Sequence, residues 1–276
     1  MAISAKEVNK LRKMTGAGMM DCKKALTEAD GDFDKAIDLL RKKGQKVSAS
    51  RADREASEGS VFVKTNEDNT EGVLIALNCE TDFVAKNEEF IGLGKDILDV
   101  AFESGASSVE ELKSKKIGDL TIEEKITEFV GKIGEKIEIS EFVKLSGEAV
   151  VPYIHAGSKL GVLVALKGVN GADVEEAGRN VGMQIAAMNP VAVDKDGVDD
   201  ATVQKELEIG KEQAIAEGKP EQIVEKIAQG KLNKFFKDNT LLNQQFVKDS
   251  SQSVANYLDS VSKGLTVTAF KRVSIG

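Results

Sequence analysis

The sequence predicts an α+β fold, and three observations support that prediction. Residues 4–43 contain three short amphipathic segments separated by turns, which is typical of a small helical bundle. Residues 61–77 align without a gap on residues 150–166, so a strand-rich unit occurs twice. A charged stretch with apolar residues at helical spacing interrupts the second copy at residues 199–239. We therefore expect a three-helix bundle, two copies of an α+β subdomain and an inserted antiparallel helical hairpin.

The amino-terminal bundle is predicted from its caps and turns. Ser4 and Glu7 have the spacing of a capping box, and two turns separate the apolar stripes that follow. The helices are expected from Ser4 to the turn at residues 15–18, from Met19 to the turn at residues 30–32, and from Phe33 to about Gly44. The bundle is assigned residues 1–45, and the polar residues 46–58 are assigned to a linker.

The two α+β subdomains follow from the internal repeat. Gly72–Leu77 matches Gly161–Leu166, and each stretch predicts the buried second strand of a hairpin. Each copy is then expected to add two helices and a returning strand. In the first copy these are expected at residues 87–103, 122–130 and 137–143, and in the second at residues 172–188, 254–261 and 265–270. The subdomains are assigned residues 59–146 and residues 147–190 with 240–276, and the hairpin is assigned residues 191–239.

Composition and charge exclude several classes of protein. With 41% hydrophobic and 30% charged residues, the chain resembles an ordinary soluble protein, and its net charge of −8 argues against direct binding of nucleic acid. Cys22 and Cys79 lie in unrelated segments, which is neither a disulfide framework nor a zinc pattern. No apolar run approaches the roughly 20 residues of a membrane span, and Met1–Glu7 lacks a signal-peptide pattern. We expect a cytoplasmic protein without membrane contact.

Candidate catalytic and ligand-binding groups are few. His155 is the only histidine, and no serine or cysteine motif accompanies it. Asp194–Gly197 imitates the opening of a calcium loop, but the later ligand positions are missing. The glycine pairs at residues 16–18 and 92–94 lack the strand-then-helix context of a phosphate loop. We expect no enzyme activity, no cofactor and no metal, and Gly92 and Gly94 are expected to let a helix pack closely.

Apolar side chains at two turns need an explanation. In Asn78–Phe90, NCETDFVAKNEEF, Phe83 follows a predicted buried strand and precedes a predicted helix. It either folds back onto its own sheet or projects as an apolar wedge into a partner. Met19 and Met20 follow a Gly-rich turn, and adjacent positions cannot both face one helical core, so at least one is expected to be exposed.

Two segments resemble the signature sequences of a known family. Thr15–Leu26, TGAGMMDCKKAL, and Asn78–Lys86, NCETDFVAK, resemble the two signature segments of the bacterial elongation factor Ts family of translation factors. The resemblance covers nearly the whole chain. It implies an amino-terminal bundle like a ubiquitin-associated (UBA) domain, a duplicated core and an inserted antiparallel coiled coil. The sequence ends at Gly276, where well-known members of the family continue into a further helical module.

The resemblance implies a guanine-nucleotide exchange factor for the GTPase elongation factor Tu. Such a factor binds the GDP-bound GTPase, promotes GDP release and holds the nucleotide-free state until GTP binds. The family's segment for displacing the partner's Mg²⁺ matches Thr81, Asp82, Phe83 and Val84. Its contacts to the partner's nucleotide-binding domain match Arg12, Met19 and Met20, and its contacts to another partner domain match the region of His155 and Gly157.

Two rival functions and one assembly question stay open at this point. The bundle could bind peptides in general, with the core as a scaffold, which predicts no effect on nucleotide release. An enzyme using His155 and nearby carboxylates predicts turnover without a GTPase, and the absence of a second strong catalytic group argues against it. The hairpin is a candidate contact for a homodimer.

Overall fold

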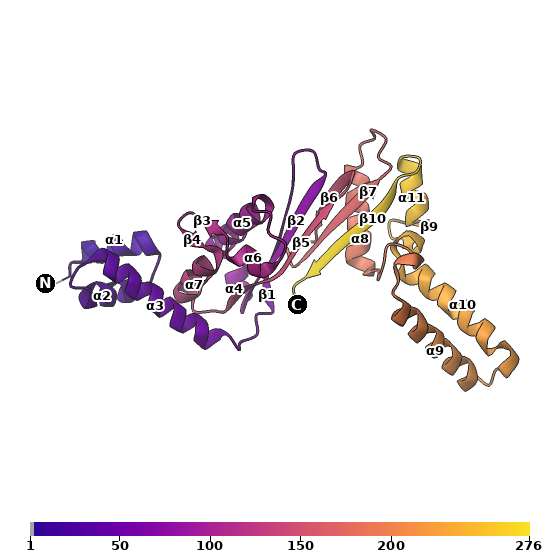
Figure 1. Ribbon diagram of the computed structural model, residues 1–276, viewed down its shortest axis with the longest axis horizontal. Coiled ribbons are helices and arrows are strands. Elements are labelled where there is room, and N and C mark those ends of the chain that lie inside the picture. Colours follow the sequence, from indigo (N-terminus) through magenta and orange to yellow (C-terminus); the bar gives the residue numbers. More distant parts are fainter. Residues whose placement is uncertain (1–2) are drawn as a thin grey trace. The chain divides into compact units, whose positions relative to one another are not determined.

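The structure is a computed structural model that describes residues 3–276 (Figure 1). Met1 and Ala2, which belong to the expected bundle and to the stretch without a signal-peptide pattern, lie outside the described residues. The chain forms two units. One comprises the residues up to Phe62, Leu74–Val143 and Ser274–Gly276, and the other comprises Val63–Val73 and Lys144–Val273. This division is coarser than the boundaries expected from the sequence, which stay predictions.

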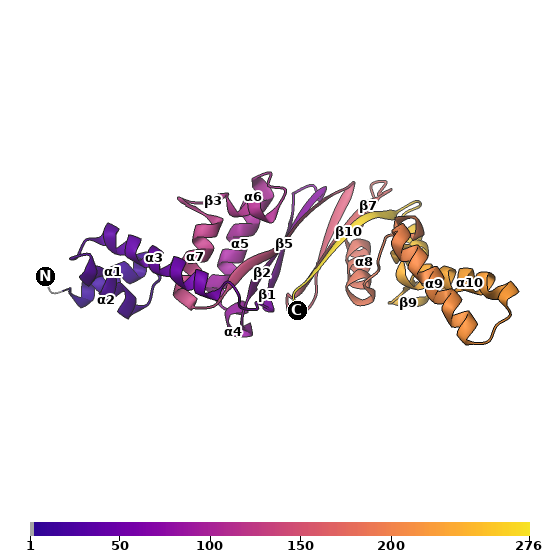
Figure 2. The ribbon, with the colours of Figure 1, turned by 60° about the horizontal axis from the view of Figure 1, so that its bottom comes forward.

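Three helices form the amino-terminal part of the first unit. They are α1 (Ala5–Thr15), α2 (Met19–Glu28) and α3 (Phe33–Arg51), and α1 and α2 pack against the first half of α3 (Figure 2). Ser4 and Glu7 form the expected capping box, and Gly16 ends α1 in the left-handed conformation with φ of 69°. The small core contains Val8, Leu11, Cys22, Ala25, Leu26, Ala29 and Ala36.

The third helix is longer than the sequence predicted. It continues through Gly44 to Arg51, so the first part of the expected linker over residues 46–58 is helical. Gly44 does not end the helix because it makes a close helix crossing. A Cβ atom on Gly131 of α7 (Ile122–Ile133) would lie 2.7 Å from the Cα atom of Gly44. The expectation that α3 ends at Gly44 is therefore wrong, because that glycine serves packing rather than termination.

The first sheet contains β1 (Glu58–Thr65), β2 (Glu71–Cys79) and β5 (Ile137–Ser146), in the order β1-β2-β5. The apolar run in β2 is buried over nearly the whole strand. Between β2 and β5 lie α4 (Asp82–Ala85), α5 (Glu88–Glu103), α6 (Val109–Lys113), β3 (Lys116–Ile117), β4 (Leu120–Thr121) and α7. Gly94 lets α5 pack on the ring of Phe62 in β1, whereas Gly92 faces open space, so only one of the two glycines serves close packing.

The second sheet has the same strand order relative to the chain. It contains β6 (Ala149–Ile154), β7 (Leu160–Lys167) and β10 (Thr266–Ser274), with β7 in the middle. Two helices, α8 (Glu175–Met188) and α11 (Val254–Val261), contribute to its core. Gly178 and Gly182 of α8 face the side chains of Val151 and Tyr153 on β6. The helices and returning strands expected from the repeat are confirmed in both copies.

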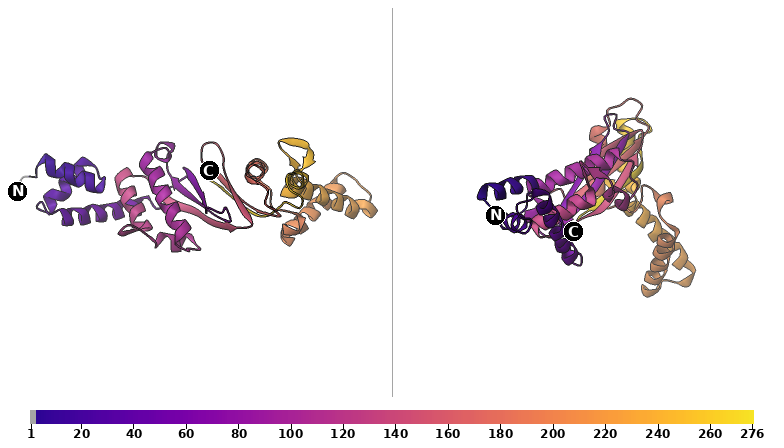
Figure 3. Two further views of the ribbon diagram at one scale, coloured as in Figure 1. Left: turned by 90° about the horizontal axis from the view of Figure 1, so that it is seen from above. Right: turned by 60° about the vertical axis from the view of Figure 1, so that its left-hand side comes forward.

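The insertion in the second copy is a helical hairpin. After η1 (Lys195–Gly197), α9 (Asp200–Ala216) and α10 (Glu221–Asn239) lie side by side and run in opposite directions (Figure 3). Their seam is thin, and its buried residues are Gly210, Ala214, Val224, Ala228 and Leu232. The chain then forms η2 (Leu241–Asn243) and a small antiparallel pair that the sequence did not predict, β8 (Gln245–Phe246) and β9 (Asp249–Ser253). Across residues 3–276, no helix has the length and apolar character needed to cross a membrane.

Candidate functional site

The turn after β2 presents Phe83 to solvent. Thr81 caps α4, and its hydroxyl oxygen accepts the Val84 N–H at 3.4 Å. Val84 and Ala85 are buried and attach this short helix to the first unit, whereas 83% of Phe83 is exposed. The alternative in which Phe83 folds back onto its own sheet is therefore wrong. We call residues 78–86 with this exposed ring the Phe83 corner.

Buried polar contacts hold the start of the Phe83 corner. The Asn78 side chain donates to the Ala56 carbonyl at 2.9 Å and accepts from the Ser140 hydroxyl at 2.7 Å. The Cys79 thiol donates to the Thr81 carbonyl at 3.2 Å. Burial, and next the nearby Glu135 carboxylate, raise the pKa of this thiol to about 12, so Cys79 is a packed thiol rather than a nucleophile.

Asp82 pairs within the corner itself. The Lys86 ammonium donates to its carboxylate at 2.7 Å, one helical turn away, and this hydrogen bond is the main cause of the raised pKa of Lys86. Both side chains are solvent-exposed, so the pair contributes little to stability. Half of the Asp82 side chain remains exposed beside Phe83, where a partner can reach it.

A second apolar surface lies where α1 meets α2. Met19 is 51% and Met20 is 62% exposed, so both side chains face solvent and the alternative that places both in the core is wrong. Met14, which the sequence analysis did not select, is 56% exposed beside them in the chain. Met14 lies three residues after the buried Leu11, which is also the spacing of a core position, so the helical period alone could not show whether Met14 is buried or exposed. We call Met14, Met19 and Met20 the methionine surface; Arg12, on the last turn of α1, is also exposed.

Lys132 of α7 links this region to the helix that follows the Phe83 corner. Its ammonium forms an ion pair with Glu89 at the start of α5. A Cβ atom on Gly16 would lie 2.9 Å from the same ammonium, so the Gly-rich turn before Met19 lies directly against it. No pattern in the sequence identified Lys132, because this contact depends on segments far apart in the chain.

His155 and Gly157 occupy the exposed turn between β6 and β7 in the second unit. The backbone N–H of His155 donates to the Leu160 carbonyl at 2.9 Å, and Gly157 has φ of 89°, a conformation that favours glycine. The His155 ring nitrogen Nδ1 lies 2.9 Å from the Tyr153 hydroxyl. The Tyr153–His155 pair is not the arrangement of nucleophile, base and orienting carboxylate that covalent catalysis uses. It places polar, hydrogen-bonding groups on the exposed turn.

The sequence-predicted residues therefore lie on three surfaces. The Phe83 corner and the methionine surface belong to the first unit, and the His155 turn belongs to the second. Within residues 3–276, no three or more histidine, cysteine, aspartate or glutamate side chains gather in a group that could hold a metal ion. Asp194, expected to serve a turn rather than calcium, caps η1 and accepts the Lys195 N–H at 2.7 Å.

Comparisons with known proteins give a consistent result. Residues 80–276 match the family described as Elongation factor TS. The chain is similar to an elongation factor Ts of Amoebophilus asiaticus, with 58% identity over 276 residues, all of both chains. It is also similar to elongation factors Ts of Cytophaga hutchinsonii, with 59% identity over 99% of both chains, and of Flavobacterium psychrophilum, with 54% identity over the same share. With relatives matched from end to end and the family match covering well over half of the chain, the chain belongs to the elongation factor Ts family.

Proposed function

We propose that this translation elongation factor is a guanine-nucleotide exchange factor for elongation factor Tu. In this proposal it binds the GDP-bound GTPase, displaces the partner's Mg²⁺, promotes GDP release and holds the empty GTPase until GTP binds. The observation that most supports it is the exposure of Phe83 on a short helix whose neighbours Val84 and Ala85 are buried. A large apolar ring in this position is suited to insertion into a partner, because little ordering entropy remains to be lost.

Exchange of this kind needs no catalytic group in the factor. If the factor binds the empty GTPase more tightly than the GDP-bound form, then by reciprocity it weakens GDP affinity by the same ratio. The factor accelerates exchange in both directions, and the nucleotide concentrations set the outcome. The lone His155 and the protonated, buried Cys79 agree with a protein that acts through binding energy alone.

The three surfaces divide the work in this proposal. Phe83, with Thr81, Asp82 and Val84 around it, intrudes near the phosphate-bound Mg²⁺ of the GTPase. Arg12, Met19 and Met20 bind the nucleotide-binding domain, with the flexible methionine side chains adapting to an apolar partner surface. His155 and Gly157 bind another domain of the GTPase. In this proposal the bundle is also UBA-like, and the inserted hairpin is a coiled coil. The hairpin is a candidate contact for a homodimer. The factor is proposed to act in the cytoplasm.

Release of fluorescent GDP from elongation factor Tu tests the proposal. We expect the wild-type factor to accelerate release, and Phe83→Ala at saturating concentration to slow the maximal rate by about one to two orders of magnitude. This range corresponds to the roughly 1.5–3 kcal/mol that burial of a Phe side chain is worth. The matched control is Val247→Ala, which trims another exposed apolar side chain and should behave like the wild type.

Each outcome has a distinct meaning. Lack of acceleration by the wild-type factor would reject exchange activity and favour the general peptide-binding alternative. Wild-type release rates with Phe83→Ala would reject the wedge role while leaving exchange itself intact. Loss of several kcal/mol of folding stability in Phe83→Ala would contradict the exposure of the ring.

A further inference from the structure

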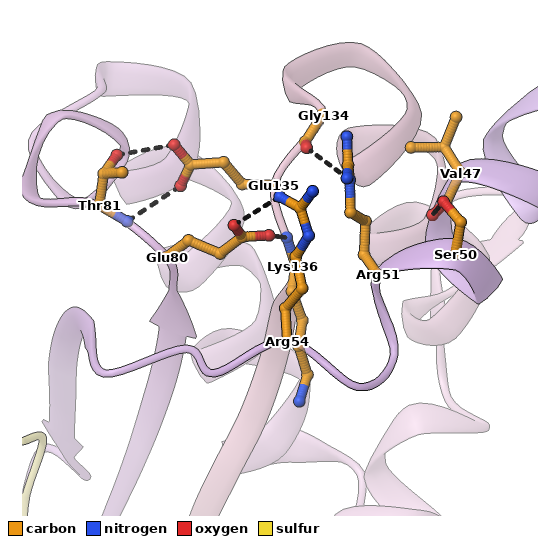
Figure 4. Close-up of polar contacts among 9 residues, drawn as sticks. All are labelled: Val47, Ser50, Arg51, Arg54, Glu80, Thr81, Gly134, Glu135 and Lys136. Carbon is orange, nitrogen blue, oxygen red and sulfur yellow. Dashed lines mark hydrogen bonds and ion pairs between the residues drawn. The ribbon is translucent and has the colours of Figure 1, made fainter.

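Two neighbouring residues of the Phe83 corner exchange hydrogen bonds with the turn between α7 and β5 (Figure 4). The Glu80 carboxylate accepts the backbone N–H of Lys136 at 2.7 Å. In the opposite direction, the Glu135 carboxylate accepts from Thr81 twice: from the backbone N–H at 3.0 Å and from the hydroxyl at 2.7 Å. We call this reciprocal arrangement of Glu80, Thr81, Glu135 and Lys136 the carboxylate clamp.

The clamp fixes the residue from which α4 starts. Both donors of Thr81 go to one Glu135 carboxylate, while the hydroxyl oxygen still accepts the Val84 N–H. Thr81 therefore has little freedom to rotate, and the side chain two residues further on, Phe83, points in a defined direction. Charge-assisted hydrogen bonds of this kind are roughly twice as strong as neutral ones, which suits them to holding an exposed turn.

Two arginines after the bundle reach the same place (Figure 4). Arg54 donates to the Glu80 carboxylate at 2.9 Å, and Arg51, the last residue of α3, donates to the Gly134 carbonyl at 3.1 Å. Burial alone would raise the pKa of Glu80, but the Lys136 N–H and the Arg54 guanidinium outweigh it and hold that pKa below its ordinary value. The Glu80 half of the clamp therefore stays ionised at neutral pH and ties the end of α3 to the corner.

We propose that Glu135 is a positioning residue for Phe83: it does not contact the partner, and it sets the orientation in which Phe83 meets it. This inference rests on the proposed exchange function. Glu135 lies 54 residues from Thr81 in the chain, and its carboxylate is the acceptor for both Thr81 donors. Loss of these bonds leaves the buried Val84 and Ala85 in place and frees the turn that carries the ring.

The test uses the full chain with the nearly isosteric change Glu135→Gln. Glutamine keeps one acceptor oxygen, but its amide nitrogen cannot accept the second Thr81 donor, and the charge is lost. We expect the maximal rate of fluorescent GDP release at saturating factor to fall by about three- to tenfold. The concentration of factor needed for half of the effect should stay within about twofold, because the methionine surface and the His155 turn are unchanged.

Glu138→Gln is the matched control. Glu138 lies near the start of β5, and its carboxylate pairs with the Lys136 ammonium at 3.1 Å rather than with the Phe83 corner. The Glu138→Gln substitution removes the same charge from the same region, and the variant factor should release GDP at the wild-type rate. Thr81→Ser keeps the hydroxyl and both donors to Glu135. Thr81→Val loses the hydroxyl that donates to Glu135 and accepts the Val84 N–H, so it should release GDP more slowly than Thr81→Ser.

A double-mutant cycle separates positioning from general structural damage. If Glu135 acts through the ring, adding Glu135→Gln to Phe83→Ala should cause no further loss of maximal release rate. Fully multiplicative losses, or a wild-type rate with Glu135→Gln alone, would overturn the proposal. If the wild-type factor accelerates GDP release in the same assay, such a result rejects the role of Glu135 without rejecting exchange activity. If Glu135→Gln lowers the thermal midpoint clearly, the Thr81→Val and Thr81→Ser pair decides, because equal rates for these two would reject the clamp.

Discussion

Two exposed apolar side chains of the first unit, Phe83 and Met20, lie on short stretches of ordered helical backbone. Phe83 is 83% exposed, although Val84 and Ala85, which follow it, are buried. The burial of these two neighbours attaches the short helix to the first unit, while the Phe83 ring faces solvent. Met20, at 62% exposure, lies in the first turn of α2, whose N-cap residue is Gly18 and which has no side-chain cap. In both cases the exposed apolar group sits on helical backbone, so binding a partner costs little backbone entropy.

Met20→Asp tests the methionine surface. Because Met20 is exposed, the substitution should leave the helical circular dichroism signal unchanged. It should weaken binding to elongation factor Tu by about ten- to a hundredfold, since it removes an apolar contact and buries a charge in its place. Val247→Asp provides the same change at another exposed apolar position and should bind normally. Unfolding of the bundle by Met20→Asp would instead assign Met20 to the core.

The Cys79 thiol gives a prediction on alkaline stability. Its folded pKa is raised to about 12 by burial and then by Glu135, against an ordinary value near 9.0. Below that ordinary value the thiol is protonated in both states and contributes no pH dependence. Between about pH 9 and about pH 12 the unfolded thiol loses its proton while the folded one keeps it, so stability falls as the pH rises.

The comparison is Cys79→Ala against the wild type by urea unfolding at about pH 8 and about pH 10.5. The stability of the wild type relative to the variant should shrink at the higher pH, because the variant lacks the thiol whose ionisation favours unfolding. Cys22 is present in both proteins and cancels. An equal difference at both pH values would contradict a raised pKa for Cys79.

At the scale of elements, the hairpin is attached through its base rather than its helices. The Val191 N–H donates to the Asn239 carbonyl at 2.9 Å, and Ala192 pairs with the fully buried Thr240. Below them the buried Gln184 of α8 donates to the Gln244 side chain at 3.1 Å. The base therefore belongs to the second subdomain, while the seam between α9 and α10 buries only small and medium side chains.

Replacement of residues 200–234 by a Gly/Ser linker of about six residues should leave the thermal midpoint nearly unchanged. The paired base, in which Val191 and Ala192 contact Asn239 and Thr240, stays in place, so a short linker can rejoin the chain at a small entropic cost. A deletion extended through Thr240 removes the paired base and should lower the midpoint clearly. A collapsed or aggregated product from the shorter deletion would show that the hairpin is integral to the core.

The crossing of α3 and α7 should depend on glycine at Gly131. A methyl group there would lie 2.7 Å from the Gly44 Cα atom, a backbone atom that cannot move without separating the two helices. Gly131→Ala should therefore lower the free energy of unfolding by about 1–3 kcal/mol in chemical denaturation. Gly92→Ala, on α5 with open space around it, should be neutral or stabilising, because alanine favours a helix over glycine. Equal effects of the two substitutions would contradict the close crossing.

For the molecule as a whole, the proposed exchange activity depends on the difference between two binding free energies: that for the GDP-bound GTPase and that for the nucleotide-free GTPase. The methionine surface and the His155 turn are expected to contact the GTPase whether or not GDP is bound, whereas the Phe83 corner is expected to act only when the ion is displaced. Contacts that are equally strong in the GDP-bound and nucleotide-free complexes strengthen binding of the factor without lowering the affinity of the GTPase for GDP. Only contacts made in the nucleotide-free complex alone make binding of the factor oppose binding of GDP.

The affinities of the factor for GDP-bound and for nucleotide-free elongation factor Tu distinguish contacts made in both complexes from contacts made only in the nucleotide-free one. Phe83→Ala should reduce the ratio of the affinity for the nucleotide-free form to that for the GDP-bound form, since the ring is proposed to insert only in the nucleotide-free complex. Met20→Asp should weaken both affinities by about the same factor and leave the ratio unchanged. Calorimetry or fluorescence titration of both forms decides the matter, and a ratio that falls with Met20→Asp but not with Phe83→Ala would reverse the assigned roles.

The sequence by itself determined the features that depend on local pattern and on repetition. The Ser4–Glu7 capping box, the buried strand predicted over Gly72–Leu77 and the matching elements of the two copies required only periodicity, caps and the alignment of the chain with itself. It also showed that Met19 and Met20 could not both be core residues, because adjacent helical positions diverge. For Phe83 it left two alternatives, since an apolar residue after a strand is equally consistent with burial and with exposure.

Only the tertiary structure decided what depends on contacts between distant segments. Exposure of Phe83, the continuation of α3 through Gly44, and the acceptance of both Thr81 donors by Glu135 each need a second segment brought close by folding. A glycine that ends a helix and one that admits a neighbouring helix have the same local sequence signature. Likewise, a glutamate 54 residues away carries no sign of its partner until the chain has folded.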